Sequence, residues 1–219
     1  MFFLSLRLFL LTCTGQLTYH FQDTTKILAS ISRQLDNGTS AEKILRDTSL
    51  IFLHPNEKFR SLIRKYPVSG ELTLVSPNEA GERIRIIAMV KDKKGNPVTN
   101  ALVFCYQTDD RGFYGMNTNH VAGVEGDRRH ARLFGYLITN SQGQFVLNTI
   151  HPRGYPNSSL PSHIHCEISG PDSSVRITEL LFDEDPRLTP DQRARSLSEG
   201  FIIARRNHNQ YEYVIVMQQ

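Results

Sequence analysis

The run SHIHCEI, at residues 162–168, places two histidines where both could bind one metal ion. Its alternation of polar and apolar residues is typical of a β-strand, in which neighbouring side chains point to opposite faces. His163, His165 and Glu167 then lie on one face, and the apolar residues between them lie on the other, facing a core. A polar stripe that faces solvent has the same pattern, so the histidine pair alone does not define a metal site.

Two tyrosines precede these histidines on segments that contain glycine and proline. Tyr155 ends the run TIHPRGY, directly before the histidine strand, and Tyr114 closes the run YQTDDRGFY. Loops that are fixed by proline and glycine on a rigid sheet often carry functional side chains. Taken singly, each tyrosine is more simply explained as a core or rim aromatic whose hydroxyl is hydrogen-bonded.

From about residue 67 the sequence predicts a mainly β domain that would position these side chains. In the run GERIRIIAMVKD the apolar residues recur at every second position, on one face: Ile84, Ile86, Ala88 and Val90. Further alternating runs occupy residues 101–107, 162–169, 175–182 and 211–218. We predict that GYLIT and QFVLNTI pair as a hairpin around the turn NSQG. Regular short strands with Gly, Asn and Pro turns favour a β-sandwich or barrel-like core.

Short helical segments are predicted beside these strands. Residues 18–66 are predicted to be mainly helical, with a capping-box pattern at Thr39–Glu42 and a second helix in PNEKFRSLIRKYP. Near the C-terminus, the run TPDQRARSLSEG predicts a helix that is capped by Thr189. We expect residues 18–66 to form an N-terminal helical appendage that packs on the β domain of residues 67–219 or on a partner chain.

The composition is that of an ordinary globular protein. The chain has 219 residues, of which 39% are hydrophobic and 21% are charged, so it can form one domain with a sizeable core. The formal net charge of +3 is small, and the basic residues are scattered along the sequence. Because a dedicated nucleic-acid binder usually concentrates its positive charge, we expect no nucleic-acid partner.

The first residues, MFFLSLRLFLLTCTGQ, form the only long apolar run. The run contains Arg7 and is too short to span a bilayer comfortably, so we interpret residues 1–17 as a signal peptide or a lipoprotein leader. The stretch LLTC resembles a bacterial lipobox, which makes Cys13 a candidate lipid anchor. We therefore expect an exported protein: secreted, periplasmic or anchored at the cell surface. The other two cysteines, Cys105 and Cys166, either pair after export or remain buried free thiols.

Taken together, these segments resemble the intradiol ring-cleavage dioxygenases, the family that includes catechol 1,2-dioxygenase and protocatechuate 3,4-dioxygenase. The resemblance begins near Gly81 and runs to the C-terminus. In order, it uses VKDKKGNPVTNALVFCYQTDDRGFYG, GYLITNSQGQFVLNTIHPRGYP, LPSHIHCEISGP and RITELLFDEDP. One short motif would mean little, but an ordered series at matching spacing is specific. The resemblance implies a β-sandwich of the intradiol dioxygenase type. Since the family often dimerises, it also makes residues 18–66 a candidate homodimer contact.

The resemblance places Tyr114 and Tyr155 on the family's two iron-binding tyrosines, and His163 and His165 on its histidine pair. Two phenolates and two imidazoles suit a hard, highly charged ion, so the implied cofactor is Fe(3+). Zinc prefers Cys, His or carboxylate ligands, and two tyrosines argue against it. Binding would force both phenols to ionise far below their usual pKa of about 10. No dissociable organic cofactor is implied.

The resemblance also implies a reaction. A catechol-type diol binds the ferric ion as a dianion and displaces Tyr155, an axial ligand that can also take a substrate proton. Tyr114 and His165 stay equatorial, and His163 stays axial. The ion draws electron density from the bound ring, which then reacts with O2 and opens between its two hydroxyl-bearing carbons. The implied partners are a small aromatic diol and O2.

Three further positions are candidates for substrate binding. Leu160 stands where active family members usually carry an Arg that stabilises developing negative charge, and Tyr106 stands where they often carry a Trp. Arg153 or Arg111 is a candidate to supply the missing charge from another direction. Two alternatives therefore stay open: a non-catalytic exported binding module of the same fold, and a different metal enzyme that reuses the histidine pair.

Overall fold

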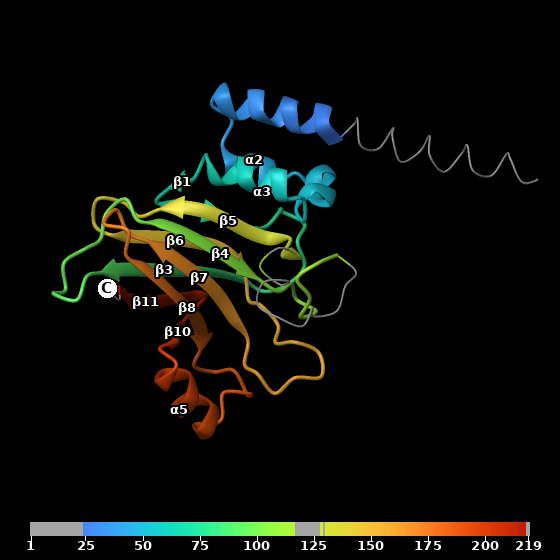
Figure 1. Cartoon of the computed structure of the whole chain (residues 1–219). Helices are drawn as coiled ribbons and strands as arrows, with labels where there is room; N and C mark the ends of the chain where they lie inside the picture. Colours follow the sequence, from blue (N-terminus) through green and yellow to red (C-terminus); the bar gives the residue numbers. More distant parts are fainter. Residues whose placement is uncertain (1–23, 117–127, 129, 218–219) are drawn as a thin grey trace, which may run out of the picture. The chain divides into compact units, whose positions relative to one another are not determined.

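A computed structural model of the chain describes residues 24–116, 128 and 130–217 (Figure 1). The chain divides into two compact units, Met1–Thr39 and Ser40–Gln219. The described part of the first unit holds a helix over residues 24–36. Residues 1–17 and Cys13, on which the leader and lipid-anchor predictions rest, lie outside the described residues. Within the described part of the chain, no helix combines the length and the apolar character needed to cross a membrane.

Two mixed β-sheets form the framework of the second unit (Figure 1). The first sheet has six strands, which in order of hydrogen-bonded neighbours are β1 (Val68–Ser69), β5 (Leu133–Ile138), β4 (Leu102–Gln107), β7 (His163–Ser169), β8 (Val175–Phe182) and β9 (Ile202–Ala204). The second has five, in the order β10 (Arg206–Asn207), β11 (Gln210–Val216), β3 (Arg83–Lys91), β6 (Gln144–Ile150) and β2 (Glu71–Thr73). The prediction of a mainly β fold is confirmed.

The core lies between the inward faces of the two sheets. From the second sheet it takes the predicted apolar face of β3, in which Ile84 is 3% exposed and the other three residues are fully buried. From the first sheet it takes the apolar residues of β7, which include Cys166. Cys105 on β4 lies directly opposite Cys166, and both are buried free thiols whose Sγ atoms lie 3.2 Å apart. Since alternate residues face inward, His163 and His165 lie on the outer face of the first sheet.

The prediction that β5 and β6 pair as a hairpin is wrong. The turn between them forms, because the Gly143 N–H donates to the Asn140 carbonyl at 2.9 Å. However, β5 pairs with β4 and β1, whereas β6 pairs with β3 and β2. The turn therefore carries the chain from one sheet to the other, so that Leu137 and Leu147 belong to one core cluster between the sheets. Alternation shows which face of a strand is buried but not which strands share a sheet.

Among its described residues, the second unit also contains the short helices α2 (Ala41–Leu45), the 3-10 helix η1 (Thr48–Leu53), α3 (Glu57–Arg64) and α5 (Pro190–Ser198). The capping-box prediction was wrong by one residue, since Ser40 is the N-cap of α2 and its hydroxyl accepts from the Lys43 N–H at 3.2 Å. The predicted cap of α5 is confirmed, because the Thr189 hydroxyl accepts from the Gln192 N–H. Helix α3 packs beside β5 (Figure 1).

Candidate metal centre

Four side chains converge on the outer face of the first sheet, and they are the four that the sequence predicts as metal ligands. The hydroxyl oxygens of Tyr114 and Tyr155 lie 2.6 Å apart. The Tyr114 oxygen lies 2.8 Å from Nε2 of His165, and the Tyr155 oxygen lies 2.8 Å from Nε2 of His163. The two Nε2 atoms are 3.1 Å apart. Both tyrosines and His163 are buried, so these donor atoms meet largely out of contact with solvent.

The histidines come from a strand that is hydrogen-bonded on both sides, since β7 lies between β4 and β8. Nδ1 of His163 lies 2.8 Å from the carbonyl oxygen of Pro161. A carbonyl only accepts, so this nitrogen must carry the ring proton of the neutral imidazole, and Nε2 then presents a lone pair to the Tyr155 hydroxyl. A neutral imidazole with one nitrogen bonded to a second partner is the usual state of a metal-binding histidine.

Tyr114 follows a turn that is organised around the buried Asp109. The carboxylate of Asp109 accepts from the backbone N–H groups of Arg111 and Phe113, at 2.9 and 3.0 Å, and pairs with the guanidinium groups of Arg111 and Arg132. Burial by itself raises the pKa of the Asp109 carboxyl, but these hydrogen bonds outweigh it and lower the pKa below its usual value. The Arg132 N–H donates to the Tyr114 carbonyl at 2.9 Å, which ties the far end of the turn to the same network.

The loop that carries Tyr155 interlocks with this turn. The Thr108 hydroxyl donates to the Arg153 carbonyl at 2.7 Å, and the Arg153 N–H donates to the Asp109 carbonyl at 3.2 Å. Gly112 has a φ of +87°, and a Cβ added there would lie 2.6 Å from the Gly154 carbonyl oxygen. The two loops can approach this closely only because residue 112 has no side chain. The two tyrosine hydroxyls are thus held by loops that contact each other directly.

The spacing of the four donor atoms fits ligands of a single ion. Metal bonds to ring nitrogen and carboxylate oxygen of about 2.0–2.2 Å, as known for zinc, put ligands at right angles about 2.8–3.1 Å apart. The five contacts between donor atoms in the cluster have lengths from 2.6 to 3.5 Å. Nε2 of His163 presents its lone pair to the cluster, so this nitrogen is able to bind a cation there. The donor set is also hard enough for a ferric ion.

The three predicted substrate-binding residues lie in different settings. Tyr106 is 2% exposed, and its ring stacks on His165 with centroids 4.4 Å apart, so it packs against one of the four clustered side chains. Leu160 lies in the loop between β6 and β7 and is 42% exposed. The Arg153 side chain is exposed, while its backbone holds the two loops together. Arg111, the other candidate for a substrate-facing charge, is instead bonded to Asp109 and to the Met116 carbonyl.

Sequence reasoning missed Glu179 and the organising role of Asp109. Glu179 lies on β8 directly opposite His165, and its Oε1 is 3.4 Å from Nδ1 of that ring. Burial raises the pKa of the Glu179 carboxyl above its usual value. With the two histidines it forms a second group whose atoms lie close enough for a metal ion. The only available signal was the alternation of VRITELLF, which does not reveal the register against β7.

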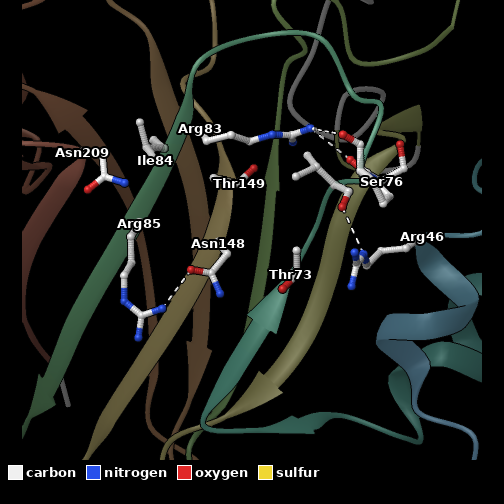
Figure 2. A pocket seen from close by; sticks show the side chains of 11 residues that line it. Arg46, Thr73, Ser76, Arg83, Ile84, Arg85, Asn148, Thr149 and Asn209 are labelled. Atoms are coloured by element: carbon white, nitrogen blue, oxygen red, sulfur yellow. Dashed lines mark hydrogen bonds between the residues drawn. The ribbon is translucent and has the colours of Figure 1, made fainter.

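A separate cavity of about 290 Å³ is lined by three arginines, Arg46, Arg83 and Arg85 (Figure 2). Arg46 and Arg85 pair with glutamates, and Arg83 donates to three backbone carbonyls, of Ser76, Pro77 and Glu79. These guanidinium groups are therefore engaged in contacts that hold the fold. None of the described residues that line the cavity is a Tyr, His, Cys or carboxylate residue, so it offers no metal site comparable to the tyrosine and histidine cluster.

The comparison with known families agrees with this geometry. The family model described as Dioxygenase matches residues 67–217, and the protocatechuate 3,4-dioxygenase beta chain of Burkholderia cepacia is 33% identical over 118 residues. The chain belongs to the intradiol ring-cleavage dioxygenase family. The alignment with the Burkholderia dioxygenase covers 51% of this chain and 49% of the relative. A catechol 1,2-dioxygenase of Candida albicans is 26% identical, over 47% of this chain and 37% of its own length.

Solved structures of intradiol dioxygenases share the fold. The dioxygenase domain of a carbohydrate-binding fusion protein from Streptomyces sp. SirexAA-E has a TM-score of 0.52 at 24% identity, over 68% of this chain and 88% of that one. Catechol 1,2-dioxygenase from Acinetobacter sp. ADP1 has a TM-score of 0.54 at 20% identity, over 70% of this chain and 58% of that one. The chain spans about half the length or less of the curated dioxygenases named above. The family match covers residues 67–217, which hold all of the β-strands that the structure describes.

Proposed function

We propose that the protein is a non-haem Fe(III) dioxygenase that uses O2 to open a catechol-type ring between its two hydroxyl-bearing carbons. The observation that carries the proposal is the convergence of two phenol oxygens and two imidazole nitrogens. Each of these atoms lies within 3.5 Å of at least one other atom of the group. Family membership supports the same reaction, since the relatives named are dioxygenases of catechol and protocatechuate.

Tyr114, Tyr155, His163 and His165 would hold the ion. When bound, ferric iron would withdraw electron density from a chelated diol and make a ring carbon reactive toward O2. The Tyr155 oxygen lies beside both the Tyr114 oxygen and Nε2 of His163, so as a phenolate it is placed to accept a proton from a substrate hydroxyl. His163 cannot take that proton, because its Nδ1 already carries the proton donated to the Pro161 carbonyl and its Nε2 would bind the ion.

The substrate is proposed to be an aromatic diol without a carboxylate. Leu160 is apolar and exposed in the loop that also carries Tyr155, and its side chain cannot pair with a substrate carboxylate. Turnover of a carboxylated catechol and of plain catechol should be compared with the same iron-loaded protein. Faster turnover of the carboxylated ring would contradict the assignment.

The site itself is tested by colour and iron content. Iron-loaded wild type should be reddish, because charge transfer from phenolate to Fe(III) absorbs visible light, and Tyr155→Phe and His163→Ala should lose the band and bind iron more weakly. Matched controls are Tyr213→Phe, which removes a hydroxyl bonded to the Leu181 carbonyl in the core, and His208→Ala on the surface. A colourless wild type whose variants bind iron equally well would overturn the site. A coloured protein that cleaves no catechol under O2 would favour the non-catalytic binding module instead.

Export and self-association are proposed on the sequence alone. Residues 1–17 would act as a leader, with Cys13 as a candidate lipid anchor, and residues 18–66 would form a homodimer contact. The mass of the full chain in solution tests the second proposal, and a monomeric mass would remove it. The N-terminal residue and any lipid on protein recovered from its native cells test the first.

A further inference from the structure

The two clustered histidines differ in what holds their outer nitrogen. Nδ1 of His163 donates to a neutral backbone carbonyl, that of Pro161, at 2.8 Å. Nδ1 of His165 instead lies 3.4 Å from a carboxylate oxygen of Glu179, close enough for the ring N–H to donate. Both nitrogens point away from the phenol oxygens, which contact the Nε2 atoms. The cluster therefore has one histidine backed by a backbone carbonyl and one backed by a side-chain carboxyl group.

The register of the sheet fixes this carboxylate in place. His165 and Glu179 are directly opposite each other on the antiparallel strands β7 and β8, and their side chains lie on the same face. Tyr106 stacks on the same imidazole from β4, with the ring planes 10° apart. The side chain of His165 is thus confined by strands on both sides, and Glu179 faces the edge of the ring that Tyr114 does not contact.

This geometry also distinguishes two ways in which His165 could bind a metal ion, with the two phenols or with Glu179. Glu179 contacts Nδ1, whereas Tyr114 contacts Nε2, and these nitrogens point out of opposite edges of the ring. An ion bound by Nε2 of His165 and the two phenol oxygens lies on one side of the ring, whereas Glu179 contacts Nδ1 on the other side. A site made of His163, His165 and Glu179 that used Nδ1 of His165 would need this nitrogen to lose its proton.

We infer that Glu179 is the positioning residue that orients His165 and strengthens its Nε2 as a ligand of the ferric ion, an inference that rests on the proposed function. A carboxylate that accepts the Nδ1 proton holds the imidazole in the required tautomer and makes its other nitrogen more basic. A more basic ligand stabilises the ferric over the ferrous state. It also raises the energy of the phenolate-to-iron charge-transfer band, because the ion becomes harder to reduce.

The test compares two substitutions at Glu179 with one matched control. Glu179→Gln keeps the size of the side chain and a carbonyl acceptor but removes the charge, and Glu179→Ala removes both. Glu167→Gln makes the same chemical change two residues from His165, where the carboxylate pairs with Arg128 at 2.7 Å. The measurements on the full chain are ferric affinity by competition with a chelator, the wavelength of the visible band, and the ferric/ferrous midpoint potential.

We expect Glu179→Ala to weaken ferric binding by about 10- to 100-fold, the usual cost of removing an outer partner of a metal-binding histidine. Glu179→Gln should bind more tightly than Glu179→Ala, while its band moves to longer wavelength and its potential rises. Glu167→Gln should match wild type in all three measurements. A red wild type with an unchanged band and affinity in both Glu179 variants would overturn this inference alone. A wild type that binds no iron would instead overturn the proposed function.

Discussion

His54 shows how a single buried residue makes the fold sensitive to pH. The side chain is 2% exposed, its Nδ1 donates to the Arg132 carbonyl at 2.6 Å, and its ring stacks on Phe59. Its Nε2 has no hydrogen-bond partner among the described residues. Burial away from water disfavours the charged form and lowers the pKa of His54 from 6.5 to about 4. The imidazole is therefore neutral in the folded protein at pH 7.

This lowered pKa predicts a loss of stability in mild acid. Between pH 6.5 and 4 the unfolded chain binds a proton at His54 that the folded chain does not, so the free energy of unfolding falls as the pH falls through this window. We expect His54 to contribute a loss of about 2 kcal/mol between pH 7 and pH 5. Urea unfolding at both pH values should show a smaller loss in His54→Gln than in wild type. His208→Gln, at an exposed position, is the control, and its free energy of unfolding should fall between the two pH values as much as that of wild type.

At the level of single residues, the sequence was sufficient to predict the four clustered side chains. Tyr114 and Tyr155 stand at motif positions whose glycines and prolines set the loops, and strand alternation put His163 and His165 on one face. Glu179 and Asp109 were not predicted as parts of the site. The contact of Glu179 depends on a pairing between β7 and β8, and that of Asp109 depends on a turn folding around its carboxylate.

At the level of elements, the interlocked loops make Gly112 sensitive to substitution. Gly112 and Gly95 both have a φ of +87°, but a Cβ at Gly95 would meet nothing within 4 Å, whereas a Cβ at Gly112 would meet the Gly154 carbonyl. Alanine at either position should cost about 1–2 kcal/mol through the backbone alone. Gly112→Ala should cost about 1–3 kcal/mol more, because the loops must separate. Urea midpoints of the two variants measure the difference, and equal values would contradict the steric contact.

The comparison of Gly112→Ala with Gly95→Ala also tests the candidate metal centre. Since the two loops carry Tyr114 and Tyr155, Gly112→Ala should also weaken iron binding, while Gly95→Ala should not.

The elements themselves were largely predictable, because period-two alternation identifies β3, β7, β8 and β11 from the sequence. The sequence did not predict which strands pair with one another. Consecutive strands β5 and β6 have the pattern of a hairpin, yet tertiary packing places them in different sheets.

At the level of the whole molecule, iron should stabilise the fold. The four donor residues come from β7 and from two separate loops, so a bound ion would link segments that unfolding separates. With free iron at 1,000 times its dissociation constant, the gain would be about 4 kcal/mol, or a rise in Tm of about 10 °C. A ferric chelator should reverse the rise in wild type. His163→Ala should show a smaller rise in Tm at the same iron concentration, because it binds iron more weakly, and a rise equal to that of wild type would place the ion elsewhere.

The pairing of the last strand with the third has a consequence for biosynthesis. β11 lies parallel to β3 along its whole length, from Gln210 beside Arg85 to Val216 beside Lys91. The second sheet therefore cannot close until Gln210–Val216 has left the ribosome, and until then the edge of β3 is open to other chains. Contacts between residues so distant in sequence also slow folding. Deletion of β11, Gln210–Val216, should therefore leave an aggregation-prone intermediate rather than a smaller stable domain.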